Sequence, residues 1–168
     1  FFFPCQRFTE AFAALCGEWC EKNGMIFTGH VLHEDSLMNQ TVPQGSLMRF
    51  YEHMGFPGVD ILTEHCRAYW AVKQLSSAAR QLGKKWLLSE LYGCTGWQFN
   101  FKSHKAVGDW QALFGINLRC HHLSWYSMQG EAKRDYPACI GHQSPWYKEY
   151  SYIEDHFARV NTALTRGT

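Results

Sequence analysis

The chain carries little charge, and it lacks the sequence features of nucleic-acid-binding, membrane-spanning and nucleotide-binding proteins. Charged residues make up 18% of its 168 positions and the net charge is +1, which gives no reason to expect a nucleic-acid partner or an anionic membrane. No apolar segment reaches the roughly 18 residues that a membrane span needs. The glycine-rich fingerprints GxGxxG and GxxxxGK[ST] follow none of the expected strands, which argues against a nucleotide-binding fold.

The seven cysteines form no recognisable metal-binding or disulfide pattern. Their number is odd, no CxxC pair occurs, and Cys16 and Cys20 lie one helical turn apart, which is not the spacing of a zinc ribbon. We therefore expect most of them to be reduced and buried, as in a reducing compartment such as the cytoplasm. The opening Phe1-Phe2-Phe3-Pro4 shows neither an initiator Met nor the basic start of a signal peptide, so we expect the sequence to begin within a longer polypeptide.

Apolar and aromatic residues, by contrast, are plentiful. Hydrophobic residues make up 46% of the chain and aromatic residues 16%, with seven Trp and eight Tyr. This composition and length predict a single domain over residues 1–168 with a sizeable core. Aromatic side chains that lie outside the core form flat apolar surfaces on which sugar rings stack.

The stretch from Lys84 to Trp97 organises the rest of the chain. Its apolar run predicts a buried parallel strand that ends on Glu90 and opens into a loop containing Gly93 and Trp97. Because α/β barrels keep their chemistry at the carboxyl ends of strands, Glu90 is a candidate catalytic residue. The alternative is a glutamate that caps the next segment or pairs with a nearby cation.

Strands and helices alternate along the sequence. After a helix over residues 6–23, strands are expected at 25–31, at 59–62, up to Glu90 and at 117–125, followed by helices at 46–54, 66–82, 103–114 and 146–165. This order predicts an α/β fold of parallel βα repeats, which is half of a (β/α)8 TIM-type barrel. A half-barrel leaves sheet edges uncovered. We therefore expect self-association, or association with a missing N-terminal half, to close it.

The expected strand ends carry carboxylates, imidazoles and indoles, with few cations. In a barrel these ends share one mouth, and the mixture suits a neutral carbohydrate substrate. Glycoside hydrolysis needs two carboxyl groups, which Glu90 and Glu34 could supply, and their separation would decide between retention and inversion. The expected substrate-binding residues are His30, His33, Asp60, Trp97, His121, Trp125 and Tyr126.

Two further features each allow two interpretations. Arg134-Asp135-Tyr136-Pro137, in the last long loop, forms either a lid over the mouth or an exposed turn with a surface ion pair. His122 is expected to make hydrogen bonds within the mouth or to the backbone. The helix aromatics are assigned to core packing by their spacing: Phe8, Phe12, Trp19, Tyr69 and Trp70.

Four blocks of the sequence resemble the catalytic barrel of large bacterial glycoside hydrolases, nearest to the α-L-rhamnosidase-type family 106 and family 2-like relatives. They run from Trp19 to His30, Phe56 to Asp60, Leu88 to Trp97, and His122 to Gly130 with Lys133 to Pro137. The resemblance covers nearly the whole chain but only the later half of that barrel. It implies that Glu90 matches the catalytic carboxylate of the seventh strand, whose partner on the fourth strand would precede Phe1. Glu34, on the implied fifth strand, would be a catalytic acid or, as we favour, a residue that binds sugar hydroxyls.

Two alternative functions remain open at this point. One is a non-catalytic carbohydrate-binding barrel, because the resemblance implies that one carboxylate of the pair would precede Phe1. The other is a metal-dependent barrel hydrolase that uses His30, Asp60 and one histidine of the last strand. Adjacent strand residues, and residues three apart, point to opposite faces, which limits the ligands from each strand to one. The main hypothesis therefore expects no metal and no cofactor.

Overall fold

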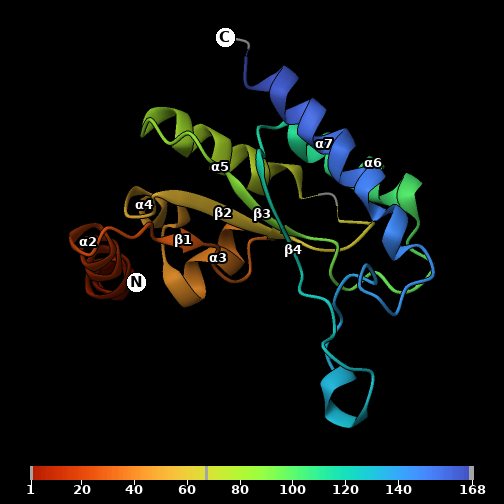
Figure 1. Cartoon of the computed structure of the whole chain (residues 1–168). Helices are drawn as coiled ribbons and strands as arrows, with labels where there is room; N and C mark the ends of the chain where they lie inside the picture. The colour runs from red at the N-terminus through yellow and green to blue at the C-terminus, as the bar shows by residue number, and fades with distance from the viewer. Residues whose placement is uncertain (1, 67, 167–168) are drawn as a thin grey trace. The chain divides into compact units, whose positions relative to one another are not determined.

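The structure is a computed structural model that describes residues 2–66 and 68–166. The chain divides into two compact units, Phe1–Asp60 with Ala68–Ser89 and Ile61–Arg67 with Glu90–Thr168, so the single domain of the sequence analysis consists of two parts. Figure 1 labels strands β1 to β4 and helices α2 to α7. No helix among the described residues is both long enough and apolar enough to cross a membrane.

The strands are β1 (Thr28–Gly29), β2 (Phe56–Ile61), β3 (Leu88–Leu91) and β4 (Leu118–His121). They form one parallel sheet in the order β1-β2-β3-β4, with β1 and β2 in register at Thr28–Phe56 and Gly29–Pro57. Each strand therefore lies beside its predecessor, as in a βα barrel, whereas the strand order of a doubly wound sheet reverses at a switch point. The predicted fold class, parallel βα repeats corresponding to half of a barrel, is confirmed.

The first unit begins with one continuous helical stretch made of α1 (Phe2–Phe8), the π-helical segment η1 (Thr9–Ala14) and α2 (Leu15–Lys22). Asn23 and Gly24 end it, and the positive φ of +68° at Gly24 suits the residue after a helix terminus. The assignment of the aromatics to the core is wrong here, because Phe12 and Trp19 are 48% and 58% exposed. Periodicity identifies an apolar face of a helix, but it does not show whether another element covers that face.

Three more helices complete this unit: α3 (Leu37–Gln44), α4 (Leu47–Glu52) and α5 (Tyr69–Gln81). The sequence analysis missed α3, although Ser36 caps it by accepting a hydrogen bond from the Asn39 amide at 3.1 Å. The close approach of β1 and β2 requires a glycine at position 58, because a Cβ atom there would lie 2.4 Å from the Gly29 carbonyl oxygen. Trp70, on α5, is exposed, which is a second error in the assignment of aromatics to the core.

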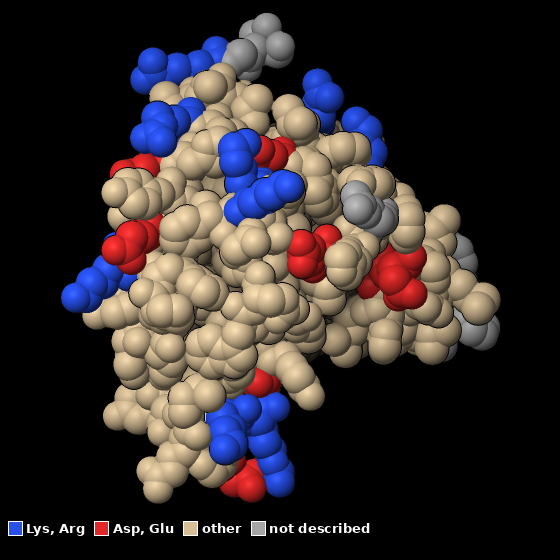
Figure 2. Space-filling model, turned by 90° about the vertical axis from the view of Figure 1, so that its right-hand side faces the viewer, with Lys and Arg blue, Asp and Glu red and all other residues tan. Residues whose placement is uncertain are grey.

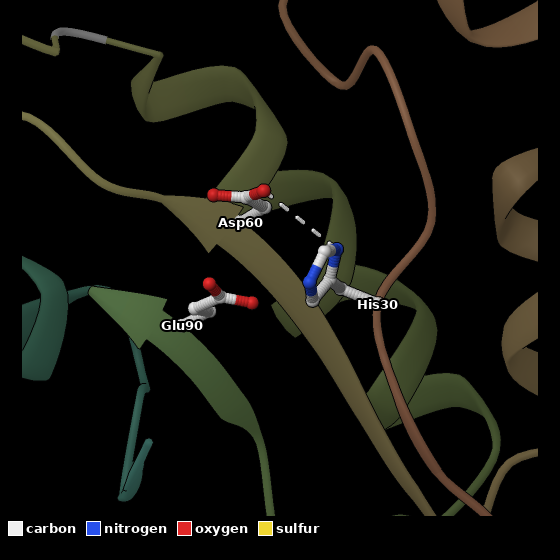
Figure 3. Close-up of side chains that lie close together, drawn as sticks. All are labelled: His30, Asp60 and Glu90. Carbon is white, nitrogen blue, oxygen red and sulfur yellow. Dashed lines mark ion pairs between the residues drawn. The ribbon is translucent and has the colours of Figure 1, made fainter. Parts of the chain in front are cut away.

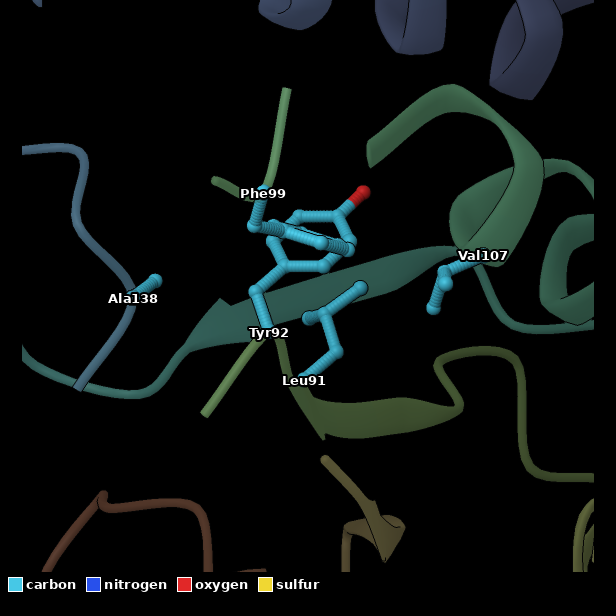
Figure 4. Close-up of a cluster of buried hydrophobic side chains, with 5 residues drawn as sticks. All are labelled: Leu91, Tyr92, Phe99, Val107 and Ala138. Atoms are coloured by element: carbon cyan, nitrogen blue, oxygen red, sulfur yellow. The ribbon is translucent and has the colours of Figure 1, made fainter. Parts of the chain in front are cut away.

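The second unit contains the end of β3, β4 and the helices α6 (Phe101–Leu113), η2 (Gly130–Lys133), η3 (Tyr147–Tyr150) and α7 (Ser151–Leu164). The Asn100 side chain caps α6 by accepting from the Ser103 amide. Helices α6 and α7 pack against each other, with the Phe157 ring directly over Gly108. A cluster of buried side chains forms this unit's core, as Figure 4 shows: Leu91, Tyr92, Phe99, Val107 and Ala138.

All seven cysteines are free thiols, as predicted, but their expected burial is largely wrong. Cys139 is buried, whereas Cys94 and Cys120 are exposed. Cysteine is so often buried that composition alone suggests burial, yet β4 is an edge strand and Cys120 faces away from the unit's core.

Candidate functional site

Glu90 lies on β3, as Figure 3 shows. Because side chains alternate along a strand, Glu90 points to the opposite face from its neighbours Ser89 and Leu91, which are buried. Its Oε1 lies 4.0 Å from Nε2 of His122, and both side chains are mostly buried. The two residues are neighbours because the His122 amide donates a hydrogen bond to the Leu91 carbonyl at 3.0 Å. This bond continues the β3–β4 ladder by one residue beyond β4.

Gly93 makes room for the His122 ring. A Cβ atom at position 93 would lie 2.7 Å from Cδ2 of His122, closer than real Cβ atoms approach other heavy atoms. The sequence analysis identified Gly93 only as the end of the strand. It left His122 out of the substrate-binding set, although in the structure His122 is a direct neighbour of Glu90.

A second carboxylate, that of Asp135, reaches the same imidazole. Its Oδ2 lies 3.5 Å from Nε2 of His122, and the Asp135 side chain is 74% exposed. Two hydrogen bonds to backbone carbonyls hold the loop there. The Trp125 side chain donates from Nε1 to the Asp135 carbonyl at 3.1 Å, and the Cys94 amide donates to the Tyr136 carbonyl at 2.7 Å. The loop therefore contacts the end of the sheet, as the lid interpretation predicts, while Arg134 also forms the surface ion pair, with Glu131.

Two indole rings lie beside these polar groups in the same unit. Trp97 stacks on Trp125 with a centroid distance of 5.4 Å and an interplanar angle of 27°. Trp125 is further held by Gln143, whose Nε2 donates to the Trp125 carbonyl at 3.0 Å. Because Trp97 remains 40% exposed, it offers an apolar ring surface to a ligand.

Two of the expected substrate-binding residues of this unit lie elsewhere. His121 points to the opposite face of β4 from His122, with its Nε2 3.2 Å from Oε1 of Glu154 on α7. Burial acts to raise the pKa of Glu154, but the neighbouring His121 and Arg119 outweigh it and hold that pKa below its usual value. Tyr126 is 96% exposed. The alternation of side chains along β4 separates His121 from His122, but the sequence does not show which of the two faces the helices.

In the first unit, the structure brings together His30, Glu34 and Asp60. His30 follows β1 directly, and its Nδ1 lies 3.9 Å from Oδ2 of Asp60 on β2, as the dashed line in Figure 3 marks. Oε2 of Glu34 accepts a hydrogen bond of 2.5 Å from the Asp60 amide. His33 does not join this group, because it is exposed and its φ of +59° directs the chain into a turn.

Glu34 is 5% exposed, and its second oxygen, Oε1, has no hydrogen-bond partner among the described residues. Burial raises its pKa to about 8, against the opposing effects of the Asp60 amide and the charge of His30. A carboxyl group with such a pKa keeps its proton at neutral pH. Glu34 therefore suits the role of a proton donor.

Metal ligation also remains a prediction. His30 and Asp60 hold an imidazole nitrogen and a carboxylate oxygen 3.9 Å apart, which suits two neighbouring ligands of one divalent ion. In the second unit, His122 and Asp135 offer a similar pair at 3.5 Å.

Comparison with known proteins does not identify a relative of this chain. No family model, curated protein or solved structure matches it. The resemblance to bacterial glycoside hydrolases therefore stays a prediction, and the candidate sites depend on their geometry.

Proposed function

We propose that this chain is the catalytic-barrel part of a glycoside hydrolase, with Glu90 as its nucleophile or general base. The observation that carries the proposal is the position of Glu90, which faces His122 from a strand end in the unit that also holds the stacked indoles of Trp97 and Trp125. In this reaction a carboxylate attacks the anomeric carbon or deprotonates the attacking water. The glycosidic C–O bond breaks, and an acid protonates the leaving oxygen.

The surroundings of Glu90 suit a neutral sugar better than an anion. Carboxylates and imidazoles form hydrogen bonds with hydroxyl groups, and an exposed indole stacks on the apolar face of a sugar ring. On the face drawn in Figure 2, both Lys and Arg and Asp and Glu side chains are present, and large areas carry no charge. A phosphorylated ligand or a nucleic acid would favour clustered cations instead.

Two residues are candidates for the acid. Glu34 keeps a proton at neutral pH, which a general acid needs. Asp135 lies in the same unit as Glu90, and the two carboxylates both approach Nε2 of His122. Asp135 was not among the catalytic residues expected from the sequence, because loop residues become neighbours of a strand only in the folded chain.

Replacing Glu90 by Gln tests the proposal, because Gln keeps the size of the side chain but can neither attack nor accept a proton. We expect hydrolysis of a panel of aryl glycosides by the protein that contains this chain to fall at least about a hundredfold, with the unfolding transition unchanged. Glu18→Gln, at an exposed position paired with Lys22, is the matched control and should keep wild-type activity. Wild-type rates in the Glu90 variant would exclude Glu90 from the mechanism.

The stacked indoles also support a second function, carbohydrate binding without turnover. Aromatic pairs with one exposed ring bind sugars whether or not a reaction follows. Titration calorimetry with neutral oligosaccharides separates the two functions. Binding that is lost in Trp97→Ala, together with no hydrolysis of any aryl glycoside by the wild type, would favour the binding protein.

A further inference from the structure

The first unit contains a cavity that takes no part in the proposed hydrolysis. Its volume is about 640 Å³, and its walls come from α1, η1, α3, α4 and α5. Small-molecule sites in proteins have volumes of about 300–1,000 Å³ and mostly apolar walls with a few polar groups. The volume of this cavity falls within that range.

Three of the lining side chains, Leu47, Gln40 and Thr9, are buried, and hydrogen bonds within the chain hold the two polar ones in place. Leu47 is buried and supplies apolar surface. Gln40 is buried as well, and its Nε2 donates to Oε1 of Gln74 and to the Glu34 carbonyl, both at 3.0 Å. Thr9, also buried, donates from Oγ1 to the Cys5 carbonyl at 3.3 Å. These bonds fix the wall in place and leave an amide pair, Gln40 and Gln74, beside the apolar surface.

The π-helical segment η1 contributes part of the lining. Its residues Thr9, Glu10 and Ala14 line the cavity. A π-helical turn is wider than an α-helical one and occurs frequently at functional sites. Helix α1 and the residue after α3 approach each other closely at the lining, because a Cβ atom on Gly45 would lie 2.3 Å from Cβ of Cys5.

The charged groups around the cavity balance one another. Glu10 and Glu52 are exposed acidic residues of the lining, and Arg49 and His53 are its basic residues. A rim of mixed sign favours neither an anionic nor a cationic ligand. The walls therefore fit an uncharged molecule.

We propose that the first unit binds an uncharged amphipathic small molecule in this cavity. Its apolar body packs against Leu47, Met48 and Ala14. Its hydroxyl group donates to Oε1 of Gln40, or its hydroxyl or carbonyl oxygen accepts from Nε2 of Gln74, because Nε2 of Gln40 already donates both of its hydrogens. This site does not depend on the glycosidase proposal, because neither Glu90 nor His122 lines it.

Titration with Nile red, an uncharged fluorescent probe with one carbonyl group, tests the site in the protein that contains this chain. We expect saturable 1:1 binding with a blue-shifted emission. Ala14→Trp fills the cavity from its wall and should weaken binding at least tenfold. Ala11→Trp places the same side chain on an exposed position of η1 outside the lining, so it should bind Nile red as the wild type does.

A second measurement keeps the test independent of folding defects and examines the polar end of the ligand. In the wild type, 1-octanol should displace Nile red at a lower concentration than octane, and Gln74→Leu should abolish that difference. Circular dichroism of each variant identifies any that fail to fold. Three results would overturn the proposal. They are no saturable binding of Nile red, equal binding by Ala14→Trp and Ala11→Trp, and dimerisation of the wild-type protein in a form that does not bind Nile red.

Discussion

Glu34 is a buried carboxyl group in a protein whose other expected site carboxylates are more exposed. Burial raises its folded-state pKa to about 8 from the usual 4.5, so between these values the folded chain binds more protons than the unfolded one. This contribution to stability is complete below pH 4.5 and is lost as the pH rises through 8. The loss reaches at most about 1.4 kcal/mol per pH unit.

Glu34→Gln should remove this dependence on pH. We expect the free energy of unfolding of the wild type to fall from pH 5 to pH 8 relative to that of Glu34→Gln, because Gln does not titrate. Urea denaturation at four pH values measures both curves, and Glu18→Gln should follow the wild type. Parallel curves for Glu34→Gln and the wild type would show that Glu34 is ionised in the folded chain.

Among single residues, the sequence identified candidate site residues that lie at the end of a predicted strand. It missed those that reach the site only through contacts between segments far apart in the chain. Glu90 follows an apolar run, and Trp97 lies in the loop behind it, so both could be found from the pattern. His122 required knowledge of which side of β4 faces Glu90. Asp135 lies 3.5 Å from His122 only because the loop is held by Trp125 and Cys94. No spacing along the chain encodes those contacts.

At the scale of elements, helices were predicted well where apolar residues recur at helical spacing. They were predicted poorly where a proline interrupts that spacing. The predicted helices at 66–82 and 103–114 correspond to α5 and α6 within a few residues. Helix α3 was not predicted, because a proline within a helical pattern normally ends the helix; here Pro43 lies in the last turn, and the helix ends at Gln44, directly before Gly45. Strands β1 and β4 are shorter than predicted, since an edge strand has a neighbour on one side only.

The contact between α6 and α7 depends on Gly108. A Cβ atom there would lie 2.1 Å from the Phe157 ring, so Gly108→Ala should push the helices apart and destabilise the protein by about 1–3 kcal/mol. This loss should exceed the gain of up to about 1 kcal/mol that Ala brings to a helix interior. Urea denaturation measures the effect.

The smaller side chain of Phe157→Leu should relieve the clash. The double variant Gly108→Ala/Phe157→Leu is therefore expected to lose less stability than the sum of the two single variants. Additive losses would contradict the contact that the structure describes, since they would show that the two positions do not interact.

At the scale of the whole molecule, the sheet ends on two edge strands, and one helical stretch exposes a row of apolar side chains. Phe12, Leu15 and Trp19 recur at spacings of three and four residues along η1 and α2, and each is about half exposed. Phe12 and Trp19 were expected to pack into a core. Exposed apolar side chains that lie in a row favour association with another protein surface.

We therefore expect the isolated chain to self-associate through this row. Trp19→Glu places a charge on the helix face and should shift the sedimentation profile toward monomer at concentrations where the wild type forms larger species. Leu113→Glu makes the same chemical change at an exposed position of α6 and should leave the profile unchanged. Both variants add one negative charge, so a difference between their sedimentation profiles must come from the position of the substitution. Equal profiles would show that the exposed row is not the surface through which the chain self-associates.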